Sequence, residues 1–224
     1  MSDQLLDCGF CGAPGATVDH VPSRKFFPQP RPSDLVTVPA CSSCNNKTSA
    51  DEEYFLHVMM SHVASEGPIV EALRIQRFSL PKTARRLRMA RQMLSRVRMV
   101  PVHSPTGVQL GFAPALEGVD FARLERVFEK VVRGLYFVEY GQRPPTDRRT
   151  QSLLDPHRQL MAHPVAQLVL RQGRGRRIGR GEFDYRIARA EDGSETALCI
   201  MLFWDALPVL SWLLRMEAGA AVVM

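Results

Sequence analysis

The sequence predicts an α+β protein in two parts. Two CxxC pairs, Cys8–Cys11 and Cys41–Cys44, frame a segment with the short apolar alternation of strands. An amphipathic helix is expected at Val119–Tyr140 because its apolar residues repeat at helical spacing. Two further segments carry hairpin signals. We therefore expect a zinc-framed module in residues 1–64 and an α+β domain with antiparallel hairpins in residues 65–224.

The composition is that of a globular protein with an uneven charge. Hydrophobic residues make up 45% of the 224 residues and charged residues 23%, which excludes a disordered, collagen-like or coiled-coil chain. The net charge is +6, yet residues 74–98 hold nine basic residues and no acidic one, and residues 171–180 hold five more arginines. Such clusters indicate a polyanionic partner.

The lack of a secretory signal and of an unbroken apolar span predicts a cytoplasmic protein. The N-terminus lacks the basic and apolar regions of a secretory signal. The longest apolar stretch, Thr196–Leu214, is broken by Asp205 and Pro208, and a membrane span needs about 20 apolar residues without such breaks. We expect a soluble, intracellular protein that has no membrane partner.

The two cysteine pairs predict a structural zinc site. A gap of two residues lets both thiolates of a pair face one ion across a tight turn, and four thiolates are the usual ligands of tetrahedral zinc. Disulfides or unrelated core cysteines are the alternatives, but a reducing compartment disfavours disulfides. Cys199 lies in an apolar run and is expected to be an inert core thiol. The predicted zinc ligands are Cys8, Cys11, Cys41 and Cys44.

The segment between the pairs carries the functional signal. Thr17–Val18 and residues 35–38 are predicted strands, and a helix is predicted from Asn45 onward. The order is strand, loop, strand, helix. In this order, the motifs CGFC, VDHVP and LVTVPACSSCN, followed by Lys47, resemble the HNH endonucleases, whose ββα-metal fold is carried on a zinc frame. The resemblance covers about residues 5–60.

The resemblance implies a metal-dependent phosphodiesterase and assigns three roles. His20 matches the general base of the family, and Asp19 matches the carboxylate that holds the catalytic cation. Asn45 matches the last letter of the motif and would be the second ligand of that cation, Mg²⁺ or Mn²⁺. Asp34 stands where the family usually has Asn. It can accept the same loop hydrogen bonds but cannot donate as an amide does. The role of Lys47 stays open because it comes one position early.

Acidic and basic residues elsewhere have simpler interpretations as well. Residues 51–53 (Asp, Glu, Glu) begin a predicted helix, where a favourable interaction with the helix dipole explains them.

Residues 72–99 are predicted to be helical, with a break at Pro81. A solvated basic face is one interpretation of their arginines and a phosphate-binding face is the other, which the lack of acids favours. The predicted nucleic-acid contacts are Arg85, Arg86, Arg88 and Arg91.

The remaining chain predicts mainly strands. Residues 99–112 form a predicted hairpin with its turn at 105–107, and residues 183–204 form a second one that turns at Asp192-Gly193. From Val165 onward we expect strands. The Gly-Arg segment 171–177 is expected to be either a phosphate-binding loop or a disordered basic one.

The leading functional hypothesis is a metal-dependent HNH endonuclease that hydrolyses phosphodiester bonds in nucleic acid. DNA is expected ahead of RNA, and a role in phage defence fits the same chemistry. The alternative is a non-catalytic zinc module that binds nucleic acid or a protein partner. Asp19, His20 and Asn45 separate the two hypotheses, because a structural zinc module needs neither a base nor two oxygen ligands around one pocket.

Overall fold

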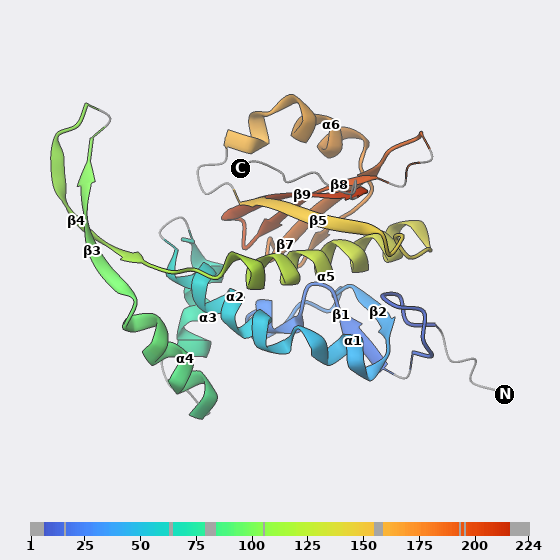
Figure 1. Cartoon of the computed structure of the whole chain (residues 1–224), viewed down its shortest axis with the longest axis horizontal. Coiled ribbons are helices and arrows are strands. Elements are labelled where there is room, and N and C mark those ends of the chain that lie inside the picture. Colours follow the sequence, from blue (N-terminus) through green and yellow to red (C-terminus); the bar gives the residue numbers. More distant parts are fainter. Residues whose placement is uncertain are drawn as a thin grey trace.

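The protein is a mixed α/β structure with antiparallel sheets. The computed structural model describes residues 7–15, 17–62, 65–78, 84–104, 106–154, 159–192, 194 and 196–215. One of the sheets has five strands. Figure 1 shows the long helix α5 (Phe121–Tyr140) between an N-terminal layer and this sheet, with α6 (Pro164–Gln172) on the far face of the sheet. Among the described residues, no helix combines the length and the apolar character needed to cross a membrane.

The N-terminal layer contains the predicted strands and helix. β1 (Thr17–His20) pairs antiparallel with β2 (Thr37–Ala40), so that His20 lies opposite Thr37. A 3₁₀ turn, η1 (Arg24–Phe26), lies in the connection between them. α1 (Ser42–Lys47) and α2 (Ser49–Ser61) follow. The order of strand, loop, strand and helix is therefore present.

Helix α5 (Phe121–Tyr140) confirms the predicted amphipathic helix and joins the two layers. Asp120 caps its first turn by accepting from the Arg123 backbone N–H at 3.3 Å, and Gly141 ends it in a left-handed conformation. Gly134 permits a close approach to the connection after β1, because a Cβ there would lie 2.6 Å from a methyl carbon of Val21. The apolar face of α5 is buried at Leu124, Val127, Phe128, Val131, Val132 and Leu135.

The C-terminal sheet comprises β5 (Arg148–Leu154), β6 (Arg177–Ile178), β7 (Phe183–Arg189), β8 (Ala197–Phe203) and β9 (Leu207–Arg215). It is entirely antiparallel, with strand order β5-β9-β8-β7-β6. The second predicted hairpin is confirmed as β7 and β8. α6 covers one face, where Ala166 and Val169 pack against Ile200 and Leu210. A short 3₁₀ turn, η2 (Gln159–Ala162), precedes α6.

Two predictions for this region are corrected. Strands were expected from Val165 onward, but Pro164–Gln172 forms α6. Pro164 favours a first helical position, and the ring Nδ1 of His163 accepts from the Val165 backbone N–H at 3.3 Å. The Gly-Arg segment is part of the sheet edge, since Arg174 exchanges backbone hydrogen bonds with Ile187 and Arg177 lies in β6.

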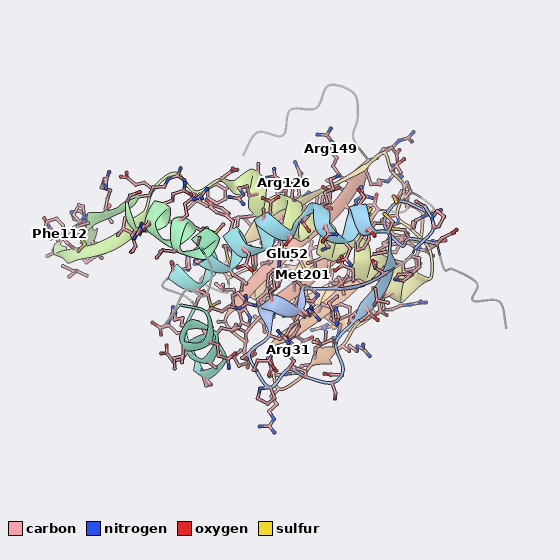
Figure 2. The ribbon with its side chains drawn as sticks, turned by 90° about the horizontal axis from the view of Figure 1, so that it is seen from below. Arg31, Glu52, Phe112, Arg126, Arg149 and Met201 are labelled. Atoms are coloured by element: carbon pink, nitrogen blue, oxygen red, sulfur yellow. The ribbon has the colours of Figure 1, made fainter. Side chains whose placement is uncertain are left out.

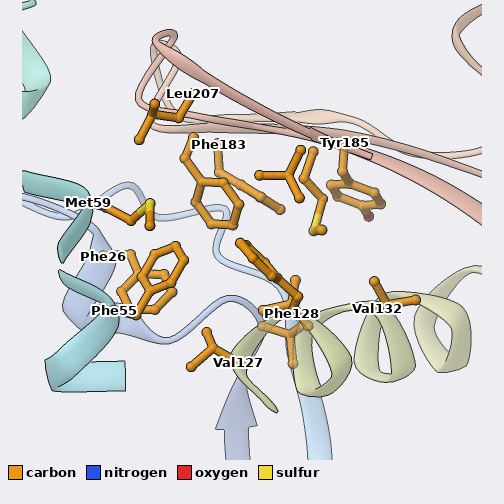
Figure 3. Close-up of a cluster of buried hydrophobic side chains, with 14 of the residues drawn as sticks. Phe26, Phe55, Met59, Val127, Phe128, Val132, Phe183, Tyr185 and Leu207 are labelled. Carbon is orange, nitrogen blue, oxygen red and sulfur yellow. The ribbon is translucent and has the colours of Figure 1, made fainter. Parts of the chain in front are cut away.

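One aromatic core connects the layers. Figure 3 shows Phe26 and Phe55 of the N-terminal layer facing Phe128 of α5 and Phe183 of the sheet. The ring centroids of Phe26 and Phe55 are 4.8 Å apart, and those of Phe55 and Phe128 are 5.5 Å apart. The Trp204 indole N–H donates to the Phe26 carbonyl at 2.7 Å. The residues of the predicted module and of the predicted second domain thus belong to one hydrophobic cluster.

A hairpin arm extends from this body. It comprises β3 (Val97–His103) and β4 (Gln109–Leu116), which confirm the first predicted hairpin. Helices α3 (Pro68–Phe78) and α4 (Ala84–Leu94) precede it, and the predicted break at Pro81 lies outside the described residues. Figures 1 and 2 show the arm reaching away from the sheet, with Phe112 near its far end.

Candidate functional site

Four cysteine thiols converge beside the β1–β2 pair. The sulfur atoms of Cys8, Cys11, Cys41 and Cys44 lie within 4.8 Å of one another, a group that can hold a metal ion such as zinc. The Cys11 and Cys41 sulfurs are 3.7 Å apart. Four sulfurs bound to one zinc at about 2.3 Å stand about 3.8 Å apart. The donor set and its spacing therefore fit a tetrahedral thiolate site.

Local backbone structure shapes this cluster. The Cys8 backbone N–H donates to the Ala13 carbonyl at 2.7 Å, and the Gly12 N–H donates to the Cys8 carbonyl at 2.9 Å, which closes the first turn. Gly9 allows the turn to approach β2, since a Cβ there would lie 2.4 Å from Val38. Burial acts to raise the pKa of Cys8, but hydrogen bonds from the backbone of residues 41, 11 and 10 outweigh it and lower the pKa to about 6. That pKa favours the thiolate, the form that binds metal.

The three residues of the predicted catalytic site line one cavity. Asp19 and His20 come from the end of β1, and Asn45 comes from α1. The cavity has a volume of about 280 Å³. Its other lining residues are Val18, Ser23, Arg24, Lys25, Asn46, Ser49 and Glu52. The structure therefore brings together residues that are 25 positions apart in the sequence.

His20 is held in a state suited to accept a proton. Burial lowers its pKa from the ordinary value, and the nearby positive charges of Arg24 and Arg31 act in the same direction. The Asp19 carboxylate opposes them without reversing the shift. A histidine with a lowered pKa is neutral at pH 7, the form that can act as a base.

Asn45 is fixed against β1 by its amide nitrogen. The Nδ2 group donates to the Thr17 hydroxyl at 3.0 Å and to the Val18 carbonyl at 3.4 Å. The Thr17 hydroxyl in turn donates to the Ala40 carbonyl at 2.8 Å, which links β1, β2 and α1. Because Nδ2 makes both bonds, neither of them uses the amide oxygen Oδ1, which can therefore accept a hydrogen bond or bind a cation.

Asp19 belongs to a buried network of charges. The Lys130 ammonium of α5 lies 2.8 Å from Asp19 Oδ2 and 2.8 Å from Glu52 Oε1. Lys25 Nζ lies 3.0 Å from Glu52 Oε2. Burial raises the pKa of Asp19 despite Lys130. Burial acts in the same direction on Glu52, but Lys130 and Lys25 outweigh it, so that the pKa of Glu52 is lowered. Asp19 thus retains one oxygen, Oδ1, that Lys130 does not occupy.

Asp34 makes a different contact from the one that the sequence predicts. It was expected to accept hydrogen bonds across the loop that follows His20. Its carboxylate instead accepts from the Gly179 backbone N–H, at 3.2 Å from each oxygen, in the turn between β6 and β7. The loop is held by the main chain, since the Val21 N–H donates to the Val36 carbonyl at 3.0 Å and extends the β1–β2 ladder. Asp34 therefore joins the loop to the C-terminal sheet.

The predicted nucleic-acid contacts lie on α4. Arg88 and Arg91 are exposed there, while the side chains of Arg85 and Arg86 lie outside the described residues.

The acids at the start of α2 form ion pairs in addition to the predicted interaction with the helix dipole. Asp51 pairs with two arginines of α5 at 2.7 Å each, and Glu52 is part of the network described above.

Sequence reasoning missed four residues of this site: Arg24, Lys25, Glu52 and Lys130. Lys130 is 111 positions from Asp19, and no short motif contains both. Arg24 and Lys25 follow His20 by four and five positions, and Glu52 lies at the start of the predicted helix, which are the only signals in the sequence that could have drawn attention to these three residues. No family model, curated protein or solved structure matches the chain.

Proposed function

We propose that the protein is a metal-dependent endonuclease of the HNH type, with zinc at its four cysteines. The observation that supports this best is the shared cavity of Asp19, His20 and Asn45, which adjoins the four-thiol cluster. A base and two oxygen ligands in one pocket are the groups that phosphodiester hydrolysis needs.

The zinc would be structural. Four thiolates saturate its coordination and leave no position for water or substrate. The cysteines come from the N-terminal turn and from the start of α1, which also carries Asn45. An ion bound there fixes the position of α1 relative to the turn, and through α1 the position of Asn45.

Within the cavity, His20 would take the proton of the attacking water. A Mg²⁺ or Mn²⁺ ion, when bound, would neutralise charge at the phosphate and stabilise the leaving oxygen. Asp19 Oδ1 and Asn45 Oδ1 are the protein oxygens suited to hold it. Two protein ligands are few, but Mg²⁺ commonly keeps several waters and takes further oxygens from substrate phosphates.

DNA is the proposed substrate ahead of RNA, with α4 supplying phosphate contacts away from the cavity. Arg88 and Arg91 are exposed on this helix, and its first turn contains no acid. The proposed localisation is the cytoplasm. Destruction of phage DNA is the biological role that we propose for this activity.

The test is a cleavage assay on plasmid, single-stranded DNA and RNA with Mg²⁺ or Mn²⁺. His20→Ala should abolish cleavage and leave zinc content and thermal stability unchanged, because it removes a proton acceptor and no structural ligand. His103→Ala is the matched control, since His103 is exposed at the tip of the hairpin arm. Equal cleavage by the wild type and by His20→Ala would contradict the proposal.

A second candidate function is a non-catalytic zinc module that binds nucleic acid. The pairing of Asp19 with Lys130 favours it, because the ammonium already occupies one oxygen of the proposed cation ligand. No cleavage of any substrate by the wild type, combined with zinc content near one per chain and salt-dependent binding, would establish this alternative.

A further inference from the structure

The mouth of the His20 cavity carries positive charge that no carboxylate among the described residues pairs with. Arg24 lies on η1, is exposed and lines the cavity. Within the described part of the chain, its guanidinium has neither a hydrogen bond nor an ion pair. Arg31 lies beside it, because its Nε donates to the Arg24 carbonyl at 3.1 Å. Arg24 thus lines the same cavity as the proposed base, and Arg31 adds a second guanidinium beside the Arg24 main chain.

The acids of the cavity do not neutralise these arginines. Asp19 and Glu52 are the two carboxylates that line it, and both pair with lysines. Lys25 is also committed, since its ammonium donates to the Ser49 carbonyl, the Ser49 hydroxyl and Glu52 at 3.0–3.2 Å. The negative charges of the two carboxylates are balanced by the positive charges of the two lysines. The positive charges of the two arginines are therefore in excess. The cavity floor is balanced, and its mouth attracts an anion.

We propose that Arg24 and Arg31 bind a phosphate group of nucleic acid at the mouth of the His20 cavity. Guanidinium groups suit this ligand because their planar donors match phosphate oxygens in pairs. The identity of the ligand rests on the proposed nuclease function, while the binding of an anion rests on the charges alone. A phosphate held there would also offer oxygens to a cation held by Asp19 and Asn45, whose two oxygens would leave its coordination incomplete.

The experiment measures binding without divalent ions, so that no cleavage occurs. The probe is a 5′-phosphorylated dinucleotide, whose short length limits its contacts outside the cavity. Titration calorimetry should show that the double variant Arg24→Gln/Arg31→Gln binds it at least tenfold more weakly than the wild type, as expected for the loss of charge-assisted hydrogen bonds. Arg149→Gln is the matched control, because Arg149 is exposed on β5 and lies far from Arg31 in Figure 2.

Two further ligands are titrated for comparison. One is inorganic phosphate. The other is a dinucleotide that has a neutral methylphosphonate linkage and no terminal phosphate. Weaker binding of both than of the phosphorylated dinucleotide supports a nucleic-acid site. Equal binding of inorganic phosphate and the dinucleotide overturns the assignment to nucleic acid. Unchanged affinity of the double variant, at unchanged zinc content and melting temperature, overturns the site itself.

The two proposals can fail separately. If the wild type cleaves DNA while the double variant binds the dinucleotide normally, the phosphate site is wrong and the nuclease function stands. If the double variant loses binding while no protein cleaves any substrate, the phosphate site stands and catalysis is wrong.

Discussion

Replacement of Lys130 by Met tests whether the charge network beneath the cavity is as buried as the structure shows. Lys130 touches Asp19 and Glu52, each at 2.8 Å, and the three side chains are 9%, 8% and 6% exposed. Met keeps the length and apolar stem of Lys and removes the charge. Glu52 would retain Lys25, but Asp19 would lose its cation. Removal of one partner from a buried ion pair costs about 3–5 kcal/mol because a charge stays buried without compensation.

We therefore expect Lys130→Met to lower the free energy of unfolding at pH 7 by about 3–5 kcal/mol in EDTA. Urea denaturation, followed by circular dichroism, measures this loss. Added Mg²⁺ or Mn²⁺ should restore part of it, because an ion that binds only the folded state stabilises it and Asp19 is then free to hold one. The zinc content should stay the same.

Two controls separate the charge from the packing. Arg149→Met removes an exposed cation and should change the free energy of unfolding by less than about 0.5 kcal/mol. Asp19→Asn combined with Lys130→Met removes both charges and should be more stable than Lys130→Met alone. A loss below about 1 kcal/mol for Lys130→Met, or a loss that the double variant does not reduce, would refute the argument from a buried pair.

Three further predictions concern other parts of the molecule. Cys44→Ser should reduce zinc to well below one ion per chain by elemental analysis and should lower the melting temperature, since metal binding is coupled to folding. Arg88→Glu/Arg91→Glu should weaken binding to DNA of every sequence and reduce the slope of log affinity against log salt by about 1–2; an unchanged slope would indicate a solvated face. Burial raises the pKa of Glu125 to about 7. At pH values between the ordinary pKa of a glutamate and 7, the folded state therefore keeps a proton that the unfolded state has lost. Stability from this group is lost as the pH rises through 7. Glu125→Gln should stabilise the protein at pH 8 by about 1 kcal/mol after allowance for solvent screening, and much less at pH 4, as measured by urea denaturation at both pH values.

The elements with a strong local signal could be predicted from the sequence. α5 has an apolar stripe, a capping Asp120 and a terminal Gly141, and each of these acts within a few residues. The hairpins have turn residues between apolar runs. α6 was missed because its apolar residues do not distinguish a short buried helix from a strand, and the signal that decides, His163 followed by Pro164, lies just before it.

The candidate site could be predicted only where its residues belong to a motif. The cysteine pairs identified the four-thiol cluster because paired CxxC spacing is a specific signal for thiols that can share one metal ion. Lys130 could not be found in this way. Its role depends on the packing of α5 against α2, which places an ammonium between carboxylates from two other elements. The spacing along the sequence contains no trace of that contact.

The same contacts explain why the proposed site depends on the whole chain. Asp19 is paired with a lysine of α5, Asp34 is bound to the turn after β6, and the Phe26 carbonyl accepts from Trp204 after β8. These three contacts hold the end of β1 and the middle and the last part of the connection between β1 and β2. A metal ion held by the four cysteines would instead tie the start of α1 to the N-terminal turn. We therefore expect a change in the C-terminal sheet to affect His20 through this loop, although no residue of the sheet lines the cavity in the described part of the chain.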